Sequence, residues 1–225
     1  MTSPTTAPLA VVVLAAGAGT RMRSATQKTL HAIGGRSLLS HSLHAAADAD
    51  PKELVAVVGH QREQVAPAVE QVADELGRGI ATAVQEEQLG TGHAAACGLS
   101  AIEGFEGTVV VTNADVPLLR AETIRGLAAA REEAGAAVTV LSLTLDDPTG
   151  YGRIVRGDSG EVLSIVEEKD ATDEQRRIDE VNSGVFAFDA AVLKDALERL
   201  DSDNAQGELY LTDVPAIPRG GGKTV

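Results

Sequence analysis

The sequence predicts an α/β protein with a mostly parallel central sheet and helices on both faces of that sheet. Runs of apolar, largely β-branched residues alternate with segments of helical periodicity along the first 145 residues. This alternation is typical of strand–helix–strand units that build a parallel sheet. The hydrophobic fraction of 44% and the charged fraction of 23% are ordinary for a globular protein. A chain of 225 residues is long enough to bury a sizeable core.

The first part of the chain divides into short apolar runs, expected as buried strands, and longer amphipathic segments, expected as helices. One helix contains Gly98, which costs about 1 kcal/mol relative to alanine in a helix interior. The expected strands are Leu9–Leu14, Leu54–Val58, Ile80–Val84, Val109–Thr112 and Ala137–Leu143, and the expected helices are Leu38–Ala47, Glu63–Leu76, Gly92–Ile102 and Ala121–Ala134.

The rhythm changes after about residue 145. A turn-rich loop, Asp146–Gly152, opens the second part, and the charged stretch Glu168–Glu180 is expected to form a solvated loop and helix. We therefore expect a flexible tail at 1–8, a first lobe at 9–145 and a smaller lobe at 146–225 packed on the carboxyl edge of the sheet. The remaining expected elements are strands Arg153–Arg156, Val162–Glu167 and Val185–Phe188, and helices Ala190–Leu200 and Glu208–Ile217.

Composition limits the classes of partner. The net charge of −14 argues against nucleic acid or an anionic membrane as the main partner, and the aromatic fraction of 2% is too low for a base-stacking platform. The single Cys97 cannot form an internal disulfide, which fits a reducing compartment. The apolar run Leu9–Ala16 is too short to span a bilayer, and the start of the chain has no targeting signal. We expect a cytoplasmic protein.

The most informative segment, Leu14–Met22, directly follows the first strand. It contains Gly17 and Gly19, which permit close approach of the backbone to a ligand, and the cations Arg21 and Lys28 follow. A strand, a glycine loop and two cations together suggest a cradle for polyphosphate. The alternative is a tight strand-to-helix turn with surface cations.

Two better-known phosphate loops do not fit this segment. A dinucleotide-binding fingerprint requires glycine at position 22, which is Met22, and an acid after the second strand, where Gly59 and His60 stand. A P-loop beginning at Gly17 requires Gly-Lys-Ser/Thr where this chain has Met22–Ser24.

Asp115 is the candidate metal ligand. It follows the strand Val109–Thr112, so it is expected at the same sheet edge as the glycine loop, where ligands of open α/β sheets bind. A carboxylate there can hold Mg²⁺ against a phosphate. The alternative is an aspartate that caps the next helix.

The segment Gln85–Ala94 is a candidate nucleobase site. The Gln85 amide offers a donor and an acceptor, which suits the imide edge of uracil or thymine, and Gly90 and Gly92 permit close approach of the backbone. The alternative is a glycine-rich start of a helix. His93 is expected to pack or cap rather than catalyse.

A fourth group lies in the second part of the chain and comprises Gly150–Ile154, Glu167 and Asn182–Gly184. A carboxylate and an amide at strand ends, with glycine N–H groups nearby, suit the hydroxyls and N-acyl group of a sugar. The alternative is a solvated surface, because Glu167 stands in a charged run.

These groups together resemble the uridylyltransferase domain of the bacterial bifunctional N-acetylglucosamine-1-phosphate uridyltransferase / glucosamine-1-phosphate acetyltransferase family. The first loop is common to many sugar nucleotidyltransferases, but its combination with the other segments is specific. The similarity covers nearly the whole chain. The segments that carry it are Leu14–Met22 with Lys28, Gln85–Ala94, Asp115–Leu118, Gly150–Ile154, Ile165–Ala171, Val181–Gly184 and Asn204–Asp213.

The resemblance implies a Rossmann-like nucleotidyltransferase fold and the reaction of UTP with N-acetylglucosamine 1-phosphate to give UDP-N-acetylglucosamine, a cell-wall precursor, and pyrophosphate. It makes 9–145 the nucleotide-binding lobe and 146–225 the sugar-binding lobe. Arg21 and Lys28 are expected to neutralise charge on the phosphates during transfer. Position by position, it implies nucleotide contacts at Leu14, Ala15, Ala16, Gly17, Arg21 and Lys28, uridine contacts at Gln85, Gly90 and Thr91, Mg²⁺ at Asp115, and sugar contacts at Gly152, Glu167 and Asn182, with Tyr210 and Thr212 nearby.

The chain departs from the family pattern in three ways. Gln27 stands where the family usually has proline, which predicts a less rigid loop at Lys28. Ala114 stands where the family usually has glycine, so its methyl group is expected to crowd the ligand or alter the backbone. The chain ends at Val225, before the family's second metal ligand and its hexapeptide-repeat acetyltransferase domain, so we expect a fragment without acetyltransferase activity. Because that domain builds the family's trimer, the fragment is expected to be monomeric.

Other functions remain open at this point. Gln85 cannot distinguish uracil from thymine, so another sugar-1-phosphate nucleotidyltransferase is the competing enzyme. A catalytically silent module that binds sugar nucleotides is the alternative from a different class, and a nicotinamide-binding domain is a distant third.

Overall fold

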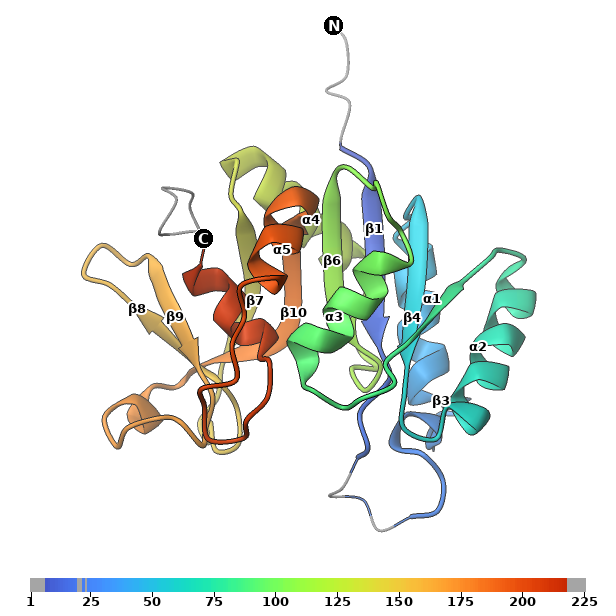
Figure 1. The fold of residues 1–225 in the computed structure, drawn as a ribbon, viewed down its shortest axis with the longest axis horizontal. Coiled ribbons are helices and arrows are strands. Elements are labelled where there is room, and N and C mark those ends of the chain that lie inside the picture. The colour runs from blue at the N-terminus through green and yellow to red at the C-terminus, as the bar shows by residue number, and fades with distance from the viewer. Residues whose placement is uncertain (1–6, 20–21, 23, 218–225) are drawn as a thin grey trace, which may run out of the picture.

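A computed structural model describes residues 7–19, 22 and 24–217 of the chain (Figure 1). The fold class is confirmed: the described residues form one eight-stranded mixed sheet with helices on both faces. The strands of this sheet are β1 (Leu9–Leu14), β4 (Glu53–Val58), β5 (Ala81–Val84), β6 (Thr108–Asn113), β7 (Val138–Thr144), β8 (Arg153–Arg156), β9 (Val162–Val166) and β10 (Glu180–Asp189). The helices are α1 (Leu38–Asp48), α2 (Arg62–Leu76), α3 (Thr91–Ser100), α4 (Ala121–Ala134) and α5 (Ala190–Leu197), and the short 3-10 turns are η1 (Lys28–Leu30), η2 (Gln175–Arg177) and η3 (Leu211–Ala216).

Strands β5, β4, β1 and β6 form the parallel half of the sheet, in that spatial order. Leu14, at the end of β1, is in register with Val57 on one side and with Asn113 on the other. The loops that follow these strands therefore leave the sheet at one edge, the lower edge in Figure 1. This is the edge at which parallel sheets bind ligands.

Strand β10 joins the parallel half to an antiparallel half. It pairs antiparallel with β6, β7 and β8, and β8 pairs antiparallel with β9. Its register with β7 shifts between Asn182 and Val185, at Gly184, whose φ is +79°. The sheet thus continues across residue 145, and the two-lobe division at that position stays a prediction.

Alternation along the central strands explains why helices cover both faces. Ala10 and Val12 of β1 face a core formed with α3, α5 and η3, whereas Val11 and Val13 face a core formed with α1, α2 and α4. Successive strand residues point to opposite faces, so a strand that is apolar throughout requires cover on both sides. Figure 1 shows α3 and α5 in front of the sheet.

Three elements differ from those expected. The predicted helix Glu208–Ile217 is wrong, because only the 3-10 turn η3 forms there. Pro215 has no backbone N–H and so cannot make the hydrogen bond that an α-helix requires at its position. The stretch Glu168–Glu180 contains no helix beyond the three-residue turn η2. A hairpin of β2 (Ala32–Ile33) and β3 (Arg36–Ser37) was not expected, and it turns at Gly34 and Gly35, which both have positive φ.

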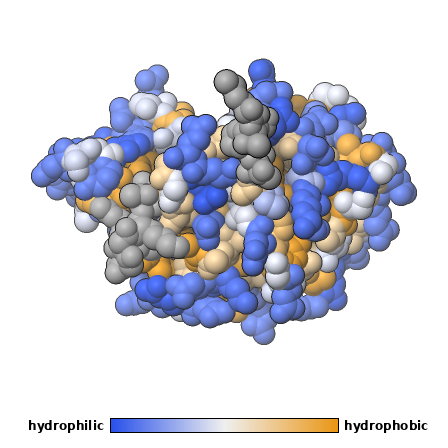
Figure 2. Space-filling model, turned by 90° about the horizontal axis from the view of Figure 1, so that it is seen from above, coloured by the Kyte–Doolittle hydropathy of each residue, from blue (hydrophilic) through white to orange (hydrophobic). Residues whose placement is uncertain are grey.

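The surface of the molecule is mostly hydrophilic on the face seen in Figure 2. Separated hydrophobic stretches lie between the hydrophilic side chains. None of the described helices combines the length and the apolar character that a membrane crossing requires.

Candidate active site

A cleft of about 460 Å³ opens at the carboxyl edge of the parallel strands. It lies between the loop after β1, the turn at Lys28, the loop after β5 and the loop after β6. The structure thus gathers on one surface many of the residues predicted for nucleotide and metal binding. The predicted residues that line the cleft are Leu14, Ala15, Ala16, Gly17, Lys28, Gln85, Gly90, Thr91 and Asp115.

The loop after β1 is tied to β4 by backbone hydrogen bonds. Ala15 N–H donates to the Val57 carbonyl (2.8 Å), and His60 N–H donates to the Ala16 carbonyl (3.1 Å). A Cβ atom built at Gly17 would meet no atom within 4 Å, so glycine there leaves the cleft open. Arg21, predicted to contact phosphate, lies outside the described residues, because positions 20, 21 and 23 are not described.

Lys28 and Asp115 face each other across the cleft. The Lys28 ammonium donates to Asp115 Oδ2, and the side chains are 37% and 32% exposed, so both remain accessible to a ligand. Ala114 N–H donates to the Leu14 carbonyl (2.9 Å), which sets Asp115 beside the loop after β1. The predicted cation and the predicted metal ligand are therefore neighbours.

Ala114 and Gln27, the two residues of this region that differ from the family pattern, lie in environments that the sequence did not indicate. Ala114 is fully buried and packs in the core beside α1 and α4, so its methyl group does not crowd the cleft as expected. Gln27 is 2% exposed, and its side chain caps η1 by accepting from Thr29 N–H (2.6 Å). A proline could not make this contact, so Gln27 restrains the Lys28 turn by a different means.

Gln85 lies at the far end of the cleft and is 3% exposed. Its Nε2 donates to the Gly90 carbonyl (3.0 Å) and lies 3.3 Å from His93 Nδ1, so the orientation of the amide is fixed. Gly90 has φ +109°, and a Cβ there would come within 2.5 Å of the Leu209 carbonyl oxygen. The Thr91 hydroxyl accepts from Leu211 N–H (3.0 Å). This end of the cleft is lined by polar groups at the start of α3.

The residues predicted for the sugar form a second group beside the cleft. Thr212 Oγ1 donates to Glu167 Oε1 (3.0 Å), and Asn182 N–H donates to the Gly152 carbonyl (2.8 Å). A Cβ at Gly152 would lie 3.3 Å from Glu167 Oε1, so the glycine brings its backbone against the carboxylate. Burial raises the pKa of Glu167, and the Thr212 hydrogen bond partly offsets that rise.

The segment 204–212 connects the two groups. Leu209 N–H donates to the Leu89 carbonyl (2.7 Å), and Gly92 N–H donates to the Leu209 carbonyl (2.8 Å). The Tyr210 hydroxyl accepts from Gln206 Nε2 (2.8 Å), and burial raises the pKa of Tyr210. Tyr210 and Thr212 therefore belong to a segment that is hydrogen-bonded to the loop after β5, and Thr212 also contacts Glu167 of the predicted sugar-binding residues.

Other residues line the cleft that the sequence did not single out individually. Gln88 lies inside the segment Gln85–Ala94, and Asn113 lies two positions before Asp115, so the sequence signal was their position beside predicted site residues. Asn113 Nδ2 also lies 3.5 Å from the Gly184 carbonyl oxygen, which links β6 to the bend in β10. Thr29 had no sequence signal, and Glu208 was not singled out within the segment Asn204–Asp213, because only the folded chain brings these residues to the cleft.

Asp115 fits one manner of metal binding. The described residues contain no group of three or more His, Cys, Asp or Glu side chains that could enclose a metal ion. Mg²⁺ commonly binds through one or two carboxylates, with the remaining ligands from substrate phosphates and water. A single accessible carboxylate beside a phosphate-binding loop fits that arrangement.

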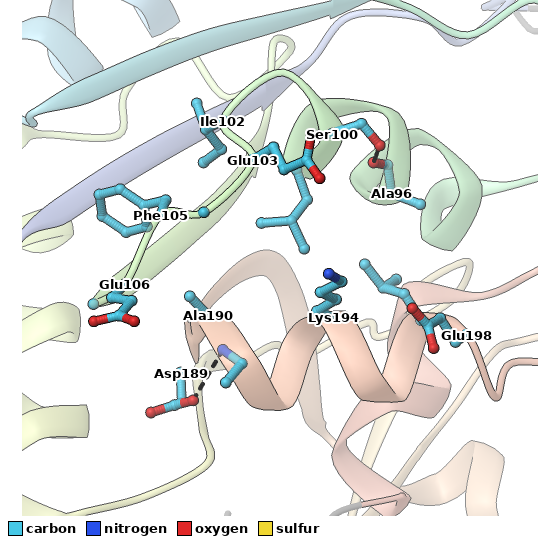
Figure 3. A pocket seen from close by; sticks show the side chains of 15 residues that line it. Ala96, Ser100, Ile102, Glu103, Phe105, Glu106, Asp189, Ala190, Lys194 and Glu198 are labelled. Atoms are coloured by element: carbon cyan, nitrogen blue, oxygen red, sulfur yellow. Dashed lines mark hydrogen bonds between the residues drawn. The ribbon is translucent and has the colours of Figure 1, made fainter.

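A larger groove of about 790 Å³ lies away from these residues, between the end of α3, the turn 101–107 and α5 (Figure 3). Two polar side chains there bond to helix backbone: Asp189 Oδ1 accepts from Ala191 N–H (3.1 Å), and the Ser100 hydroxyl donates to the Ala96 carbonyl (2.9 Å). None of the predicted site residues lines this groove, so the smaller cleft carries the candidate chemistry.

The chain is similar to known proteins. The chain is 67% identical over 217 residues to the "Bifunctional protein GlmU" of Corynebacterium jeikeium (strain K411), and 60% identical over 228 residues to the protein of the same name from Mycobacterium sp. (strain KMS). These alignments cover 96% and 100% of this chain but only 44% and 46% of the relatives, so the chain spans less than half of their length.

Solved structures share the fold at low sequence identity. A UDP-glucose pyrophosphorylase complexed with UDP-glucose superposes with a TM-score of 0.78 at 17% identity, covering 97% of this chain and 89% of the other. A putative glucose-1-phosphate thymidylyltransferase from Bacillus anthracis superposes with a TM-score of 0.77 at 20% identity, covering 96% and 84%.

The model of one protein family, described as the MobA-like NTP transferase domain, matches residues 11–207. This range runs from β1, through the cleft, to the segment that joins the two groups of site residues. The chain therefore belongs to the family of MobA-like NTP transferase domains.

Proposed function

We propose that this chain transfers the uridylyl group of UTP to N-acetylglucosamine 1-phosphate, releasing pyrophosphate and forming UDP-N-acetylglucosamine for cell-wall synthesis. The observation that carries the proposal is the pairing of Lys28 with Asp115 in a cleft that Gln85 also lines. The similarity to proteins named bifunctional GlmU supports the choice within the NTP transferase family. We propose the cytoplasm as the site of action.

In this proposal the phosphate oxygen of the sugar phosphate attacks the α-phosphorus of UTP. A new P–O bond forms, the bond to the β-phosphate breaks, and pyrophosphate leaves with its electron pair. Such a transfer requires little covalent work from the protein, so positioning and charge neutralisation provide most of the rate enhancement.

Each part of the cleft has a task in this reaction. Lys28, together with Arg21, neutralises charge on the phosphates, and the Leu14–Gly17 backbone holds the triphosphate. Asp115 would hold Mg²⁺, which supplies positive charge to the phosphate oxygens when bound. Gln85, Gly90 and Thr91 hold the uridine. Gly152, Glu167, Asn182, Tyr210 and Thr212 form the sugar site.

An assay of pyrophosphate release tests the proposal. We expect release with UTP, N-acetylglucosamine 1-phosphate and Mg²⁺ together, and none when any one of them is omitted. The panel includes dTTP and glucose 1-phosphate, because the Gln85 amide can pair with thymine as well as uracil. A preference for either would contradict the proposed substrates. Binding of UDP-N-acetylglucosamine without turnover would identify the silent binding module instead.

A further inference from the structure

The side-chain amide of Gln27 bridges the two segments that carry the proposed phosphate contacts. Gln27 Oε1 accepts from Thr29 N–H (2.6 Å) and from the Thr29 hydroxyl (2.5 Å). On the other side, Gln27 Nε2 donates to the Gly17 carbonyl (3.0 Å). The amide is thus bonded to the turn that bears Lys28 and to the glycine loop after β1.

The chemistry of the partners fixes the orientation of this amide. Thr29 N–H can only donate, so it requires Oε1, and the Gly17 carbonyl can only accept, so it requires Nε2. A flipped amide would lose both bonds. Because Gln27 is only 2% exposed, water cannot readily replace either partner.

A second contact shows how closely the two segments approach. Gly19 has φ +59°, and a Cβ built there would lie 2.7 Å from Lys28 Cβ. The glycine loop therefore rests against the stem of the Lys28 side chain. The Gln27 amide lies behind this contact and does not itself line the cleft.

We propose that Gln27 is a positioning residue for the nucleoside triphosphate. Its amide sets the distance between the Gly17–Gly19 loop and Lys28, so that the loop backbone and the ammonium reach the same triphosphate. This inference rests on the proposed function, because it assumes that the two segments share one ligand.

Three substitutions at position 27 distinguish the contribution of the side-chain amide from that of the backbone conformation. Gln27→Met keeps the length of the side chain and removes the donor and the acceptor. Gln27→Glu keeps the acceptor for Thr29 but loses the donor to Gly17. Gln27→Pro is compatible with the backbone φ of −57°, so it stiffens the turn while it removes the side-chain amide and the N–H that donates to Gln64 Oε1.

Titration calorimetry with UTP and Mg²⁺, followed by steady-state kinetics, measures the effect. We expect Gln27→Met to raise the Kd for UTP by about tenfold, because all three hydrogen bonds of the Gln27 side-chain amide are lost. Gln27→Glu should weaken UTP binding at least as much, since its carboxylate also repels phosphate. Gln27→Pro should weaken UTP binding less than Gln27→Met, because the proline ring restrains the backbone of the turn. The KM for N-acetylglucosamine 1-phosphate should change less than twofold in all three.

Gln64→Met is the matched control. Gln64 Oε1 accepts from the backbone N–H of Gln27 (3.3 Å), so this variant loosens the same turn from its outer side and leaves the amide bridge in place. Its Kd for UTP should stay within twofold of the parent value. An equal weakening in Gln64→Met, or an unchanged Kd in Gln27→Met, would overturn the inference.

The binding measurement also separates this inference from the proposed function. If the parent protein binds another nucleoside triphosphate and does not turn over UTP, the proposed substrates are wrong. The same Kd ratios, measured with the nucleotide that does bind, then decide the role of Gln27. A parent protein that binds no nucleoside triphosphate contradicts both.

Discussion

The Lys28 ammonium donates a hydrogen bond to the Asp115 carboxylate, although 87 positions separate the two residues in the sequence. The contact arises because β1 and β6 are parallel neighbours, so the loops that follow them leave the sheet together. Each charge neutralises the other across the cleft, and both remain partly exposed. If a phosphate binds the Lys28 ammonium and a divalent cation binds the Asp115 carboxylate, both charges stay paired when the ion pair opens.

Replacing the cation of this pair should cost activity rather than folding. We expect Lys28→Ala to lower kcat/KM by about 10²-fold, which corresponds to about 3 kcal/mol of lost charge stabilisation in the transition state. Pyrophosphate release at saturating Mg²⁺ provides the measurement. Lys194→Ala, on the exposed side of α5, is the control for loss of a positive charge. Normal turnover in Lys28→Ala would remove this lysine from the mechanism.

Replacing the carboxylate should alter the dependence on metal. Asp115→Asn keeps the shape of the side chain and removes its charge, so a divalent cation loses its anionic protein ligand. We expect the Mg²⁺ concentration for half-maximal activity to rise at least tenfold, as measured by titration at fixed UTP. An unchanged Mg²⁺ requirement in this variant would exclude Asp115 as the ligand.

The Thr212–Glu167 hydrogen bond should set the pH dependence of binding at the proposed sugar site. Burial already raises the pKa of Glu167, and Thr212 lowers it by donating to the charged form. Thr212→Val removes that donor, so the pKa of Glu167 should rise further. We expect the acid limb of the pH profile for N-acetylglucosamine 1-phosphate to move to higher pH, with a KM about fivefold higher.

Thr144→Val, at the exposed end of β7, controls for loss of a hydroxyl elsewhere. The KM for UTP should be the same in the parent and both variants, since the hydroxyls are outside the nucleotide cleft. A pH profile of Thr212→Val that overlays the parent profile would show that the hydrogen bond does not tune Glu167.

Asp213 should make stability depend on pH. Burial, followed by the charges of Asp201, Glu167 and Asp170, raises the pKa of Asp213 from 3.8 to about 6. The folded state therefore holds this proton more tightly than the unfolded state does, and the free energy of unfolding falls as pH rises from about 4 to about 6. Because the group is half-buried, solvent screening reduces the effect.

The variant Asp213→Asn removes this titration. We expect it to be about 1 kcal/mol more stable than the parent at pH 7.5, and equal to the parent below pH 4. Urea unfolding at both pH values checks the difference. A gain in stability that is the same at the two pH values would show that the carboxyl does not titrate in this window.

Two glycines in helices should respond in opposite directions to alanine. At Gly98, in α3, a Cβ would meet Val12 Cγ1 at 2.5 Å and Val57 Cγ2 at 2.9 Å, so Gly98→Ala should destabilise the fold by about 2 kcal/mol. At Gly126, in α4, a Cβ would meet no atom within 4 Å, so Gly126→Ala should stabilise it by about 1 kcal/mol. Thermal unfolding of both variants measures the contrast, and a gain in Gly98→Ala would contradict the packing argument.

Much of the fold was predictable because its signals are local. The strand Leu9–Leu14 and the helix Ala121–Ala134 have the bounds expected from the sequence. Apolar alternation and helical periodicity determine such elements with little help from distant residues. The segment 208–217 was predicted wrongly, since its apolar spacing resembles that of a helix while Pro215 and the hydrogen bonds to loop 89–92 limit it to a 3-10 turn.

The candidate site was predictable where a candidate residue closely follows a strand. Gln85 and Asp115 could be found in this way, because the ends of parallel strands meet at one edge. The contact of Gln27 with Gly17 and the place of Glu208 in the cleft could not be predicted, because they depend on where the intervening chain returns to that edge. Arg21 stays a prediction from the sequence.

The strand–helix alternation, the family motifs and the kinds of side chain available for phosphate, metal and sugar follow from the local sequence. Three features depend instead on how distant segments pack: Lys28 pairs with Asp115, the Ala114 methyl group lies in the core, and Gly98 is required although helix propensity favours alanine. Propensity and charge belong to single residues, whereas free volume and hydrogen-bond partners are defined between segments that meet when the sheet has formed.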